Sequence, residues 1–351
     1  MPMKILILGP VINKKTSGGV AVFTEELNNG FISLGHTSNI LSIGKSDKID
    51  NLVVNGSDNS RKIWSNLGRF ADRIREFRPD EVICSLQYIA GIKKYIKKWP
   101  FAKYIMVIHG QPVPTSQGIV KAKALELFHK RYKKYFYKTV NVSFLSAAII
   151  QSINGIKCDD AIFNGTSMPV PTREELSRER KYDFVYVGRL FRDKNVEMMM
   201  ESLVLLHKKE PNLRVAVAGF GEQESLFTKG KYKLDFIDFK GRLDRESVRK
   251  LLLDSKTFIN LCVLESCGIA VLEAAMCGCG IAVPPTTGSV PLFYDMSFYH
   301  PVSFCSIEKL ANDYRNIYFG DRKINSEDIA TFAKRVSWET VSQQYIELIN
   351  Q

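Results

Sequence analysis

The sequence predicts an α/β protein with two doubly wound, mostly parallel sheets in succession. Short β-rich segments alternate with helix-length segments along the chain, the alternation breaks once near the middle, and 351 residues exceed what one ordinary core accommodates. Sheets of this kind bind ligands at the carboxyl ends of their strands, so functional residues are expected in the loops that follow the strands.

The first half begins with a buried strand at 4–8 and a glycine turn. Its strands are expected at 4–8, 38–43, 80–85, 104–109 and 140–145, with helices that include 19–34, 60–77 and 119–138. Strands and helices in regular alternation are typical of βαβ units, which form parallel sheets.

The break falls at the proline-rich 168–171 and the charged stretch 172–181, a composition typical of a linker. Beyond it, strands are expected at 182–187, 213–218, 235–239, 257–261 and 280–284, with helices near 194–209, 244–254, 268–277 and 326–349. We therefore expect one domain at 1–168, a second at 169–325 and a closing helix within 326–351.

Composition places the chain among globular proteins without a membrane span. Hydrophobic residues make up 45% and charged residues 25%, and no apolar run approaches the roughly 20 residues that a span requires. The N-terminus lacks the pattern of a secretory signal, which predicts a cytoplasmic location. The seven cysteines form no C-x-x-C pair, so reduced thiols are expected rather than disulfides or a zinc site.

The positive charge is concentrated in the first half. Residues 1–165 contain 24 lysines and arginines against 12 acids, and the remainder contains 25 against 25. A one-sided basic domain indicates an anionic partner: nucleic acid, an anionic membrane surface or an anionic acceptor.

Two segments, 92–99 and 125–138, place apolar or aromatic residues at helical spacing with lysines between them. Helices of this profile lie on anionic membrane surfaces, with Lys93, Lys94, Lys97 and Lys98 facing the lipid in the first segment. The alternative is a helix that covers a sheet and exposes a solvated lysine face.

The most informative motif pairs Glu265 and Glu273 around Gly268. Gly268 opens a predicted helix, and a helix N-terminus offers unpaired N–H groups to a diphosphate while the glycine lets phosphates approach closely. The carboxylates could accept hydrogen bonds from sugar and ribose hydroxyls. The alternative is that Glu265 caps the helix and Glu273 is a solvated helix residue.

A second motif follows the strand at 182–187. Gly188 and Arg189 are followed by Lys194, so two cations stand five residues apart at the edge of a helix. Arginine supplies a planar fork of donors and lysine a point charge, a pair suited to a departing diphosphate, although an ordinary basic loop would also fit. Gly219 and Gly221 form a weaker glycine turn after the next strand.

In this order, the two motifs resemble those of the retaining glycosyltransferases of the two-Rossmann-domain (GT-B) type, group 1 or family 4, whose signature is a glutamate, seven residues and a second glutamate. The resemblance extends over almost the whole chain through Gly18-Gly19, Gly35-His36-Thr37, Arg78 to Val82, His109-Gly110, Asn164-Gly165 and Val336-Ser337-Trp338. It implies two Rossmann-like domains that face each other across a cleft, the first binding acceptor and the second donor, with the last helix packing back on the first.

The resemblance also implies roles for individual residues. Arg189 and Lys194 would neutralise the donor diphosphate, Glu265 would bind the donor sugar, Glu273 would bind the ribose, and His109 would lie beside donor sugar and acceptor. Backbone groups at Gly268-Ile269 and Gly18-Gly19, with the turns at Gly188, Gly219 and Gly221, would surround the donor, and Asn164 is a further candidate. Asn195 departs from the pattern, because a glycine usually follows the lysine.

The implied reaction transfers a sugar from a nucleotide-diphosphate sugar, uridine favoured over guanosine, to a saccharide or lipid-linked acceptor with retention of anomeric configuration. No Asp-x-Asp triplet occurs, which favours a metal-independent site without a cofactor. We expect a role in surface polysaccharide or lipopolysaccharide assembly, at the inner face of the cell membrane and without nucleic acid as a partner.

Two other enzymes of the same architecture remain as alternatives. They are a nucleotide-sugar epimerase, which needs no acceptor, and a phosphorylase, which needs a lysine-bound pyridoxal cofactor. A non-catalytic protein that binds nucleic acid or membrane through its basic half would leave the motifs of the second half without a role.

Overall fold

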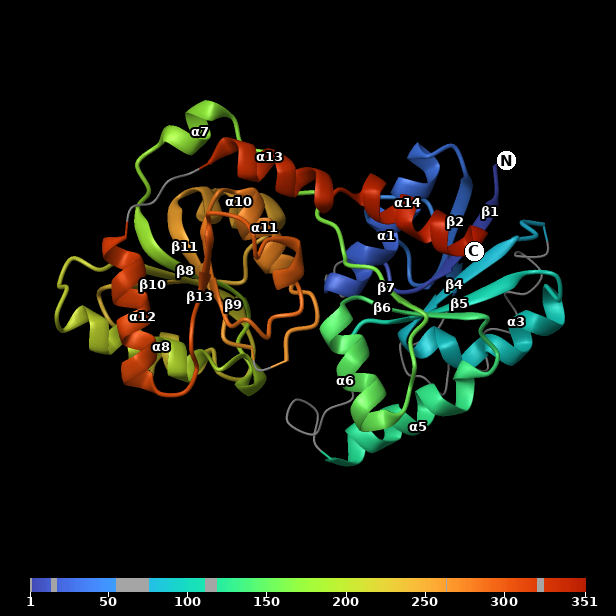
Figure 1. Cartoon of the computed structure of the whole chain (residues 1–351), viewed down its shortest axis with the longest axis horizontal. Coiled ribbons are helices and arrows are strands. Elements are labelled where there is room, and N and C mark those ends of the chain that lie inside the picture. The colour runs from blue at the N-terminus through green and yellow to red at the C-terminus, as the bar shows by residue number, and fades with distance from the viewer. Residues whose placement is uncertain (1, 14–17, 55–75, 111–118, 263, 321–324) are drawn as a thin grey trace. The chain divides into compact units, whose positions relative to one another are not determined.

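The computed structural model describes residues 2–13, 18–54, 76–110, 119–262, 264–320 and 325–351 (Figure 1). The chain divides into two compact units, the first comprising Met1–Ser167 with Ser337–Gln351 and the second Met168–Val336. Most of the helix expected at 60–77 lies outside the described residues. Among the residues described, no helix has both the length and the apolar character needed to cross a membrane.

The first unit contains a seven-stranded sheet in the order β3-β2-β1-β4-β5-β6-β7, and all its described strand pairs are parallel. Its strands are β1 Lys4–Leu8, β2 Thr37–Ile43, β3 Leu52–Val54, β4 Glu81–Ser85, β5 Lys103–Ile108, β6 Lys138–Asn141 and β7 Asp160–Ala161. The strand order reverses between β1 and β4, as in a doubly wound sheet.

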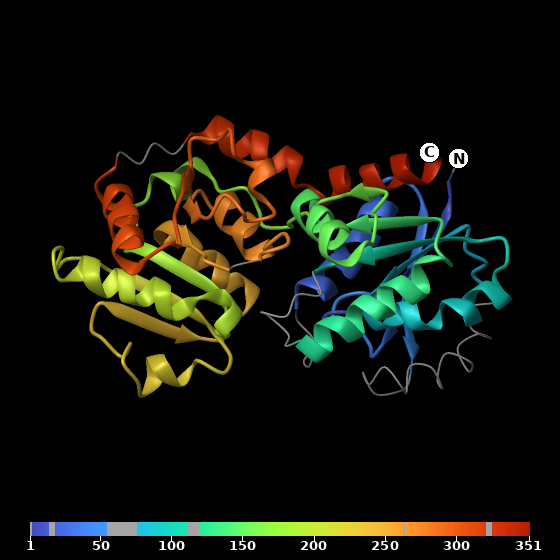
Figure 2. The ribbon, with the colours of Figure 1, turned by 60° about the horizontal axis from the view of Figure 1, so that its bottom comes forward.

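Helices cover both faces of this sheet (Figures 1 and 2). They are α1 Gly19–Ser33, α3 Ile92–Lys98 after the 3-10 turn η1 Leu86–Gly91, α5 Ile119–Lys133, α6 Phe144–Asn154 and α14 Trp338–Asn350. The strand expected at 140–145 ends early, because the Ser143 hydroxyl accepts a hydrogen bond from the Ser146 N–H at 3.1 Å and so starts α6.

The closing helix expected at 326–349 is two helices. α13 Ser326–Arg335 belongs to the second unit and α14 to the first. Ser337 separates them, because its extended backbone ends α13 and its hydroxyl caps α14 by accepting from the Thr340 N–H at 3.0 Å. α14 packs closely on α1, where a Cβ at Gly30 would lie 2.0 Å from the Ser342 hydroxyl.

The second unit repeats the architecture with a six-stranded parallel sheet in the order β10-β9-β8-β11-β12-β13. The strands are β8 Tyr182–Arg189, β9 Val215–Phe220, β10 Ile237–Gly241, β11 Ser255–Ile259, β12 Gly280–Val283 and β13 Tyr299–Pro301. Its helices are α7 Arg173–Ser177, α8 Val196–His207, α9 Ser225–Thr228, α10 Arg245–Leu253, α11 Ile269–Met276, α12 Ile307–Phe319 and α13, with 3-10 turns η2 Arg192–Lys194 and η3 Val290–Leu292.

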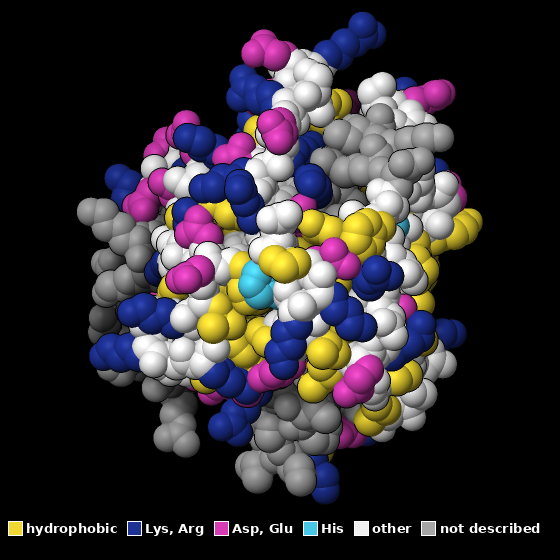
Figure 3. Space-filling model, turned by 90° about the vertical axis from the view of Figure 1, so that its left-hand side faces the viewer, with side chains coloured by type: hydrophobic (Ala, Val, Ile, Leu, Met, Phe, Trp, Pro, Cys, Tyr) yellow, Lys and Arg dark blue, Asp and Glu magenta, His cyan; other side chains and the backbone are white. Residues whose placement is uncertain are grey.

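One face of the second unit mixes the two signs of charge (Figure 3). Lysines and arginines are interspersed with acids there, in agreement with the even count in this half of the sequence. Beneath that surface, Phe184, Val217 and Ile259 are fully buried in one apolar core with the inward side of α8. The ordered core fixes where the strands end, and therefore where the loops begin.

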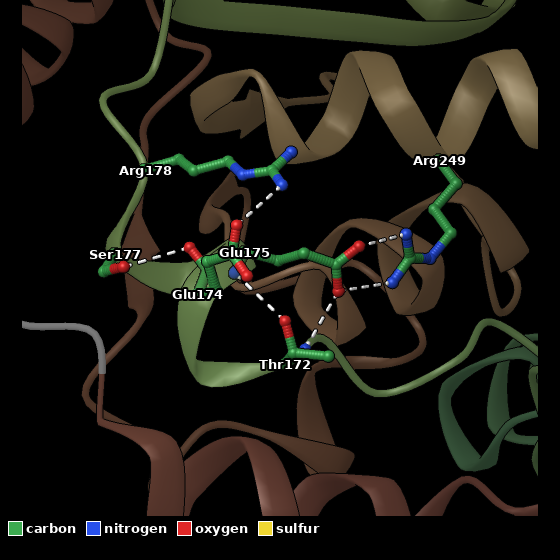
Figure 4. A network of polar contacts seen from close by, with 6 residues as sticks. All are labelled: Thr172, Glu174, Glu175, Ser177, Arg178 and Arg249. Atoms are coloured by element: carbon green, nitrogen blue, oxygen red, sulfur yellow. Dashed lines mark hydrogen bonds and ion pairs between the residues drawn. The ribbon is translucent and has the colours of Figure 1, made fainter.

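The linker segment is ordered by a polar network around α7 (Figure 4). Thr172 and Glu175 form a capping box, with the Thr172 hydroxyl accepting from the Glu175 N–H at 3.1 Å and the Glu175 carboxylate accepting from the Thr172 N–H at 2.9 Å. Arg249 of α10 donates two further bonds to Glu175, of 2.7 and 2.9 Å. These bonds hold the pKa of Glu175 at about 2 and fasten the linker to α10.

Removing the Glu175–Arg249 ion pair should destabilise the second unit. We expect Arg249→Ala to lower the free energy of unfolding by about 1 kcal/mol, because a half-buried, bidentate ion pair is lost. The loss should be present in full above the ordinary glutamate pKa and should fade as the pH falls through about 2, below which Glu175 is protonated in both the folded and the unfolded state. Thermal unfolding measured at several pH values checks this.

Arg178→Ala is the matched control, because Arg178 pairs with the neighbouring Glu174 at 3.3 Å while its side chain is 63% exposed. It should leave the midpoint unchanged. Equal effects of the two substitutions would contradict a specific role for the Glu175–Arg249 pair.

Candidate active site

The sequence motifs of the second unit meet at the point where its strand order reverses. β8 lies between β9 and β11, and the carboxyl ends of β8 and β11 lead into the two loops that bear the candidate residues. In doubly wound sheets this point is the usual ligand position.

Lys194 and Glu265 form a buried ion pair at this point. The Lys194 Nζ lies 2.7 Å from a Glu265 carboxylate oxygen, and only 13% and 15% of the two side chains are exposed. Burial opposes the charge on Lys194, but the neighbouring Glu265 carboxylate outweighs it, so the pKa of Lys194 lies above its ordinary value. Both groups are therefore held in fixed positions by each other.

Two asparagines hold the loops that carry this pair. The Asn195 side chain donates to the Leu261 carbonyl at 3.1 Å, which ties the end of η2 to the loop after β11. Asn195 also has a φ of +50°, a left-handed conformation that asparagine tolerates better than most residues and that explains why glycine is usual there. Asn260 donates to Glu265 at 3.4 Å and accepts from the Cys262 N–H at 2.8 Å.

The loop then opens into α11 at Gly268, and Ile269 is the first helical residue. Gly268 has a φ of +69°, and a Cβ there would lie 2.9 Å from Glu265 Cγ, so this position requires glycine. No described side chain caps the helix, which excludes Glu265 as its cap. Asp244 and Ser306, by contrast, cap α10 and α12 with their side chains. The first N–H groups of α11 thus remain available for an anion.

The glycine turns beside the pair permit close strand packing. Gly188 and Gly219 are register partners in β8 and β9, and a Cβ at Gly219 would lie 1.9 Å from the Gly188 carbonyl oxygen. A Cβ at Gly221 would lie 2.6 Å from the Leu190 carbonyl oxygen. Both glycines are therefore required by the fold at the edge of the site, whatever they contact in a ligand.

Glu273 lies one turn further into α11 and is not a solvated helix residue. Its side chain is 16% exposed, and the Arg245 Nε of α10 lies 4.0 Å from one of its carboxylate oxygens. Burial raises the pKa of Glu273 to about 7, against a smaller opposing effect of Arg245. The sequence did not single out Arg245, because the contact joins two helices that are separate in the chain.

Arg189 has more open surroundings than Lys194. Its side chain is 57% exposed, lies over the Phe191 ring with 5.1 Å to the centroid, and approaches Asp193 at 3.7 Å. Its carbonyl oxygen accepts from the buried Tyr186 hydroxyl at 2.7 Å, which fixes the backbone at the end of β8. The two predicted cations thus differ: Lys194 is paired and buried, and Arg189 is accessible.

His109, Gly18, Gly19 and Asn164 lie in the first unit. His109 follows β5, and its Nε2 lies 3.0 Å from the Ser85 hydroxyl at the end of β4. Its ring meets Phe23 of α1 edge-on at a centroid distance of 4.5 Å. Burial lowers the pKa of His109 to about 3, so the imidazole is neutral at physiological pH.

The other first-unit candidates are backbone groups and one buried amide. α1 begins at Gly19 with Gly18 as its N-cap, and none of the described side chains caps it. Asn164 is buried, and its side-chain oxygen accepts no hydrogen bond within the described part of the chain. In this respect α1 resembles α11, because neither helix has a side-chain cap at its N-terminus among the described residues.

The second unit matches a known family. Residues 171–291 match the family model described as Glycosyl transferases group 1, a segment that includes Arg189, Lys194, Glu265 and Glu273. Because the match covers about a third of the chain, it supports this family for the second unit.

Two curated relatives are enzymes that transfer sugars. The chain is 30% identical over 145 residues to the tRNA-queuosine alpha-mannosyltransferase of Drosophila melanogaster, covering 40% of this chain and 38% of that protein. It is 27% identical over 123 residues to one polypeptide of the phosphatidylinositol N-acetylglucosaminyltransferase of Homo sapiens, covering 34% of this chain and 25% of that polypeptide. The matched region thus spans less than half of either relative.

A solved structure resembles the chain over its full length. HepE of Anabaena, in complex with UDP and glucose, matches with a TM-score of 0.77 at 13% identity over 99% of each chain. At this identity the likeness shows the fold, which is that of a GT-B glycosyltransferase. Together the comparisons show that the second unit resembles the group 1 glycosyltransferases and that the chain has the fold of the GT-B enzymes.

The buried carboxyl of Glu273 gives a prediction about stability. We expect Glu273→Gln to raise the free energy of unfolding by about 1–3 kcal/mol at pH 8, where the wild-type carboxylate is ionised and poorly solvated. The folded pKa lies above the unfolded value, so the carboxyl stabilises the fold below about pH 4.5 and the gain is lost as the pH rises through 7. Thermal unfolding at pH 4.5 and 8 should therefore show the two proteins converging at the acidic end.

Glu246→Gln, an exposed acid of α10, is the control and should change neither midpoint. A lower midpoint of Glu273→Gln at pH 8 would mean that the carboxylate is stabilised by its surroundings, contrary to this prediction.

Proposed function

We propose that the chain transfers a sugar from a nucleotide-diphosphate sugar to a saccharide or lipid-linked acceptor, with retention of anomeric configuration and without a metal ion. The observation that carries the proposal is the Lys194–Glu265 pair beside the uncapped N-terminus of α11, at the strand-order reversal of the second sheet. It joins a cation, a carboxylate and free N–H groups, as a sugar diphosphate requires.

In this proposal the diphosphate binds at the start of α11. The N–H groups of Gly268 and Ile269 donate to phosphate oxygens, and Lys194 and Arg189 neutralise the charge that grows on the diphosphate as the sugar departs. Lys194 is held in place before the donor arrives, so little reorganisation is needed when this charge develops. Arg189, being accessible, can turn toward the incoming phosphates.

The two glutamates bind opposite ends of the donor. Glu265 accepts hydrogen bonds from sugar hydroxyls through the lone pairs that Lys194 leaves unused, and Glu273 accepts from the ribose hydroxyls. A carboxyl with a pKa near 7 can also donate one hydrogen bond when protonated, so donor binding should depend on pH around neutrality.

The first unit contributes a neutral His109 and the N-terminus of α1. An imidazole that stays neutral can accept a hydrogen bond from a sugar hydroxyl at one nitrogen while the other contacts Ser85. The N–H groups at Gly18-Gly19 are a second position for phosphate oxygens, and Asn164 offers an amide oxygen that is unpaired among the described residues.

Retention follows in this scheme from substitution on one face of the sugar. The bond between the anomeric carbon and the diphosphate oxygen breaks through an oxocarbenium-like state, the acceptor oxygen bonds to the same face, and the acceptor proton passes to the departing diphosphate. The protein stabilises charge on the leaving group and supplies no covalent nucleophile.

Uridine is the proposed base because HepE, a structure of the same fold, binds UDP. The acceptor is left as a saccharide or a lipid-linked saccharide, and the names of the two curated relatives specify a tRNA queuosine and a phosphatidylinositol. We further propose a cytoplasmic enzyme in surface polysaccharide or lipopolysaccharide assembly, whose basic first half meets anionic lipid at the inner face of the cell membrane. Nucleic acid is not the proposed partner, because it would leave the motifs of the second half without a role.

A thermal-shift panel of UDP, GDP, ADP and their common sugar conjugates tests the donor site. Ligand at about 100 times its dissociation constant adds about 2.7 kcal/mol of stability, so one base should raise the midpoint clearly. Arg189→Ala and Glu273→Ala should abolish the shift, whereas Lys229→Ala and Glu308→Ala, both exposed and distant in sequence, should retain it. No shift with any nucleotide would overturn the proposal.

The metal-independent mechanism has its own test. Transfer activity should survive EDTA, because the diphosphate charge is met by Arg189, Lys194 and the N-terminus of α11. Loss of activity in EDTA that Mn²⁺ restores would contradict this part of the proposal and leave the transferase reaction intact.

A further inference from the structure

The helices α3 and α5 lie on one face of the first sheet, and α1 and α14 lie on the other (Figures 1 and 2). Alternate strand residues separate the two sides: Leu6 and Leu8 share a buried cluster with Tyr95 and Tyr132 of α3 and α5, whereas the intervening Ile7 is buried outside that cluster. The inward sides of α3 and α5 are thus occupied by the core.

The outward side of α5 is basic with an apolar centre. Lys123, Leu127, Arg131 and Lys134 follow each other at spacings of three or four residues and are all exposed, Leu127 by 66%. Glu126 is the single acidic residue in the described part of this helix, and its carboxylate lies 2.6 Å from the Lys130 Nζ. The remaining cations therefore surround an exposed leucine.

α3 extends the same surface. Lys93 and Lys97 are exposed, whereas Lys94 and Lys98, expected on the same face, are half-buried. Lys93 of α3 and Lys134 beside α5 both lie over the Tyr135 ring, each 5.4 Å from its centroid, so the two helices present adjoining cations. We call Lys93, Lys97, Lys123, Leu127, Arg131 and Lys134 the α3–α5 surface.

This combination fits an anionic bilayer better than a nucleic acid. Basic side chains gain from anionic headgroups, and an aliphatic side chain in their midst gains when it enters the boundary of the acyl chains. On a nucleic acid, the leucine would face phosphates and gain nothing, and the Tyr135 ring, which could stack on a base, already has two lysine ammonium groups against it.

We propose that the α3–α5 surface docks on membranes that contain anionic lipid, with Leu127 at the acyl boundary and the five cations among the headgroups. The inference rests on the proposed function, whose membrane location it deepens by naming the surface. In this inference the bilayer lies on the α3–α5 side of the first sheet, whereas α14 packs with α1 on the other side.

Co-sedimentation of the full chain with vesicles tests it. The wild type should bind phosphatidylcholine vesicles with about 30% phosphatidylglycerol, should bind pure phosphatidylcholine weakly, and should be released at about 0.5 M salt. Replacing Lys97, Lys123, Arg131 and Lys134 by serine should weaken binding at least a hundredfold, since each basic residue contributes about fivefold. Leu127→Ser should weaken it about tenfold with the charge unchanged.

Matched controls come from elsewhere on the chain. The charge control replaces four exposed lysines of the second unit by serine and so removes the same charge from outside the α3–α5 surface: Lys208, Lys209, Lys229 and Lys233. The apolar control is Ile32→Ser, which removes a side chain that is 51% exposed on α1. Neither should change vesicle binding by more than about twofold. If the control variants lose binding as the α3–α5 variants do, net charge rather than this surface is responsible, and the inference fails.

A nucleotide thermal shift on the same variants separates this inference from the proposed function. A shift with UDP that persists while no protein binds vesicles would overturn the docking surface alone, and vesicle binding without any nucleotide shift would overturn the donor site alone. Salt-sensitive binding of tRNA that the four-serine variant loses, with no binding to vesicles, would assign the surface to RNA and overturn the inference.

Discussion

The pairing of Lys194 with Glu265 is the contact on which the candidate donor site depends. The two residues are 71 positions apart and follow different strands, yet their charged atoms lie 2.7 Å apart in a setting that excludes most solvent. A buried pair of this kind costs free energy to desolvate unless further hydrogen bonds support it. Asn260 supplies one to Glu265, and Asn195 ties the lysine loop to the glutamate loop. These two hydrogen bonds hold the loops after β8 and β11 in place around the ion pair.

Burial also sets the protonation states that the proposed chemistry would use. Glu273 and His109 are both pushed toward their neutral forms, the first with a pKa of about 7 and the second of about 3. The ionised, buried carboxylate of Glu273 destabilises the fold at high pH. A ligand with hydroxyl groups would donate hydrogen bonds to this carboxylate, which gives the residue a role in binding that offsets its cost to stability. Stability and ligand binding therefore make opposite demands on this residue.

The two halves of the chain differ in charge and in the roles proposed for them. The second half of the sequence is electrically balanced and holds the paired charges of the candidate donor site. The first half carries the excess cations, and some of them lie on the outward sides of α3 and α5. The linker belongs to the second unit, fastened by Glu175 and Arg249, and the chain returns to the first unit at Ser337. Each unit has its own core and its own parallel sheet.

The sequence by itself determined the fold class and most strands of both sheets, because periodic apolar segments and glycine turns are local signals. It also placed Lys194 and Glu265 among the candidates, because residue type and spacing follow the chain. Only the tertiary structure decided that these two meet, that Arg245 faces Glu273, that the last helix is broken at Ser337, and that Lys94 and Lys98 turn partly inward. The short strands β3, β7 and β13 also escaped prediction, since two or three residues carry no period. The physical reason is common to all of these: burial and pairing depend on neighbours brought from distant parts of the chain, and a local pattern does not contain them.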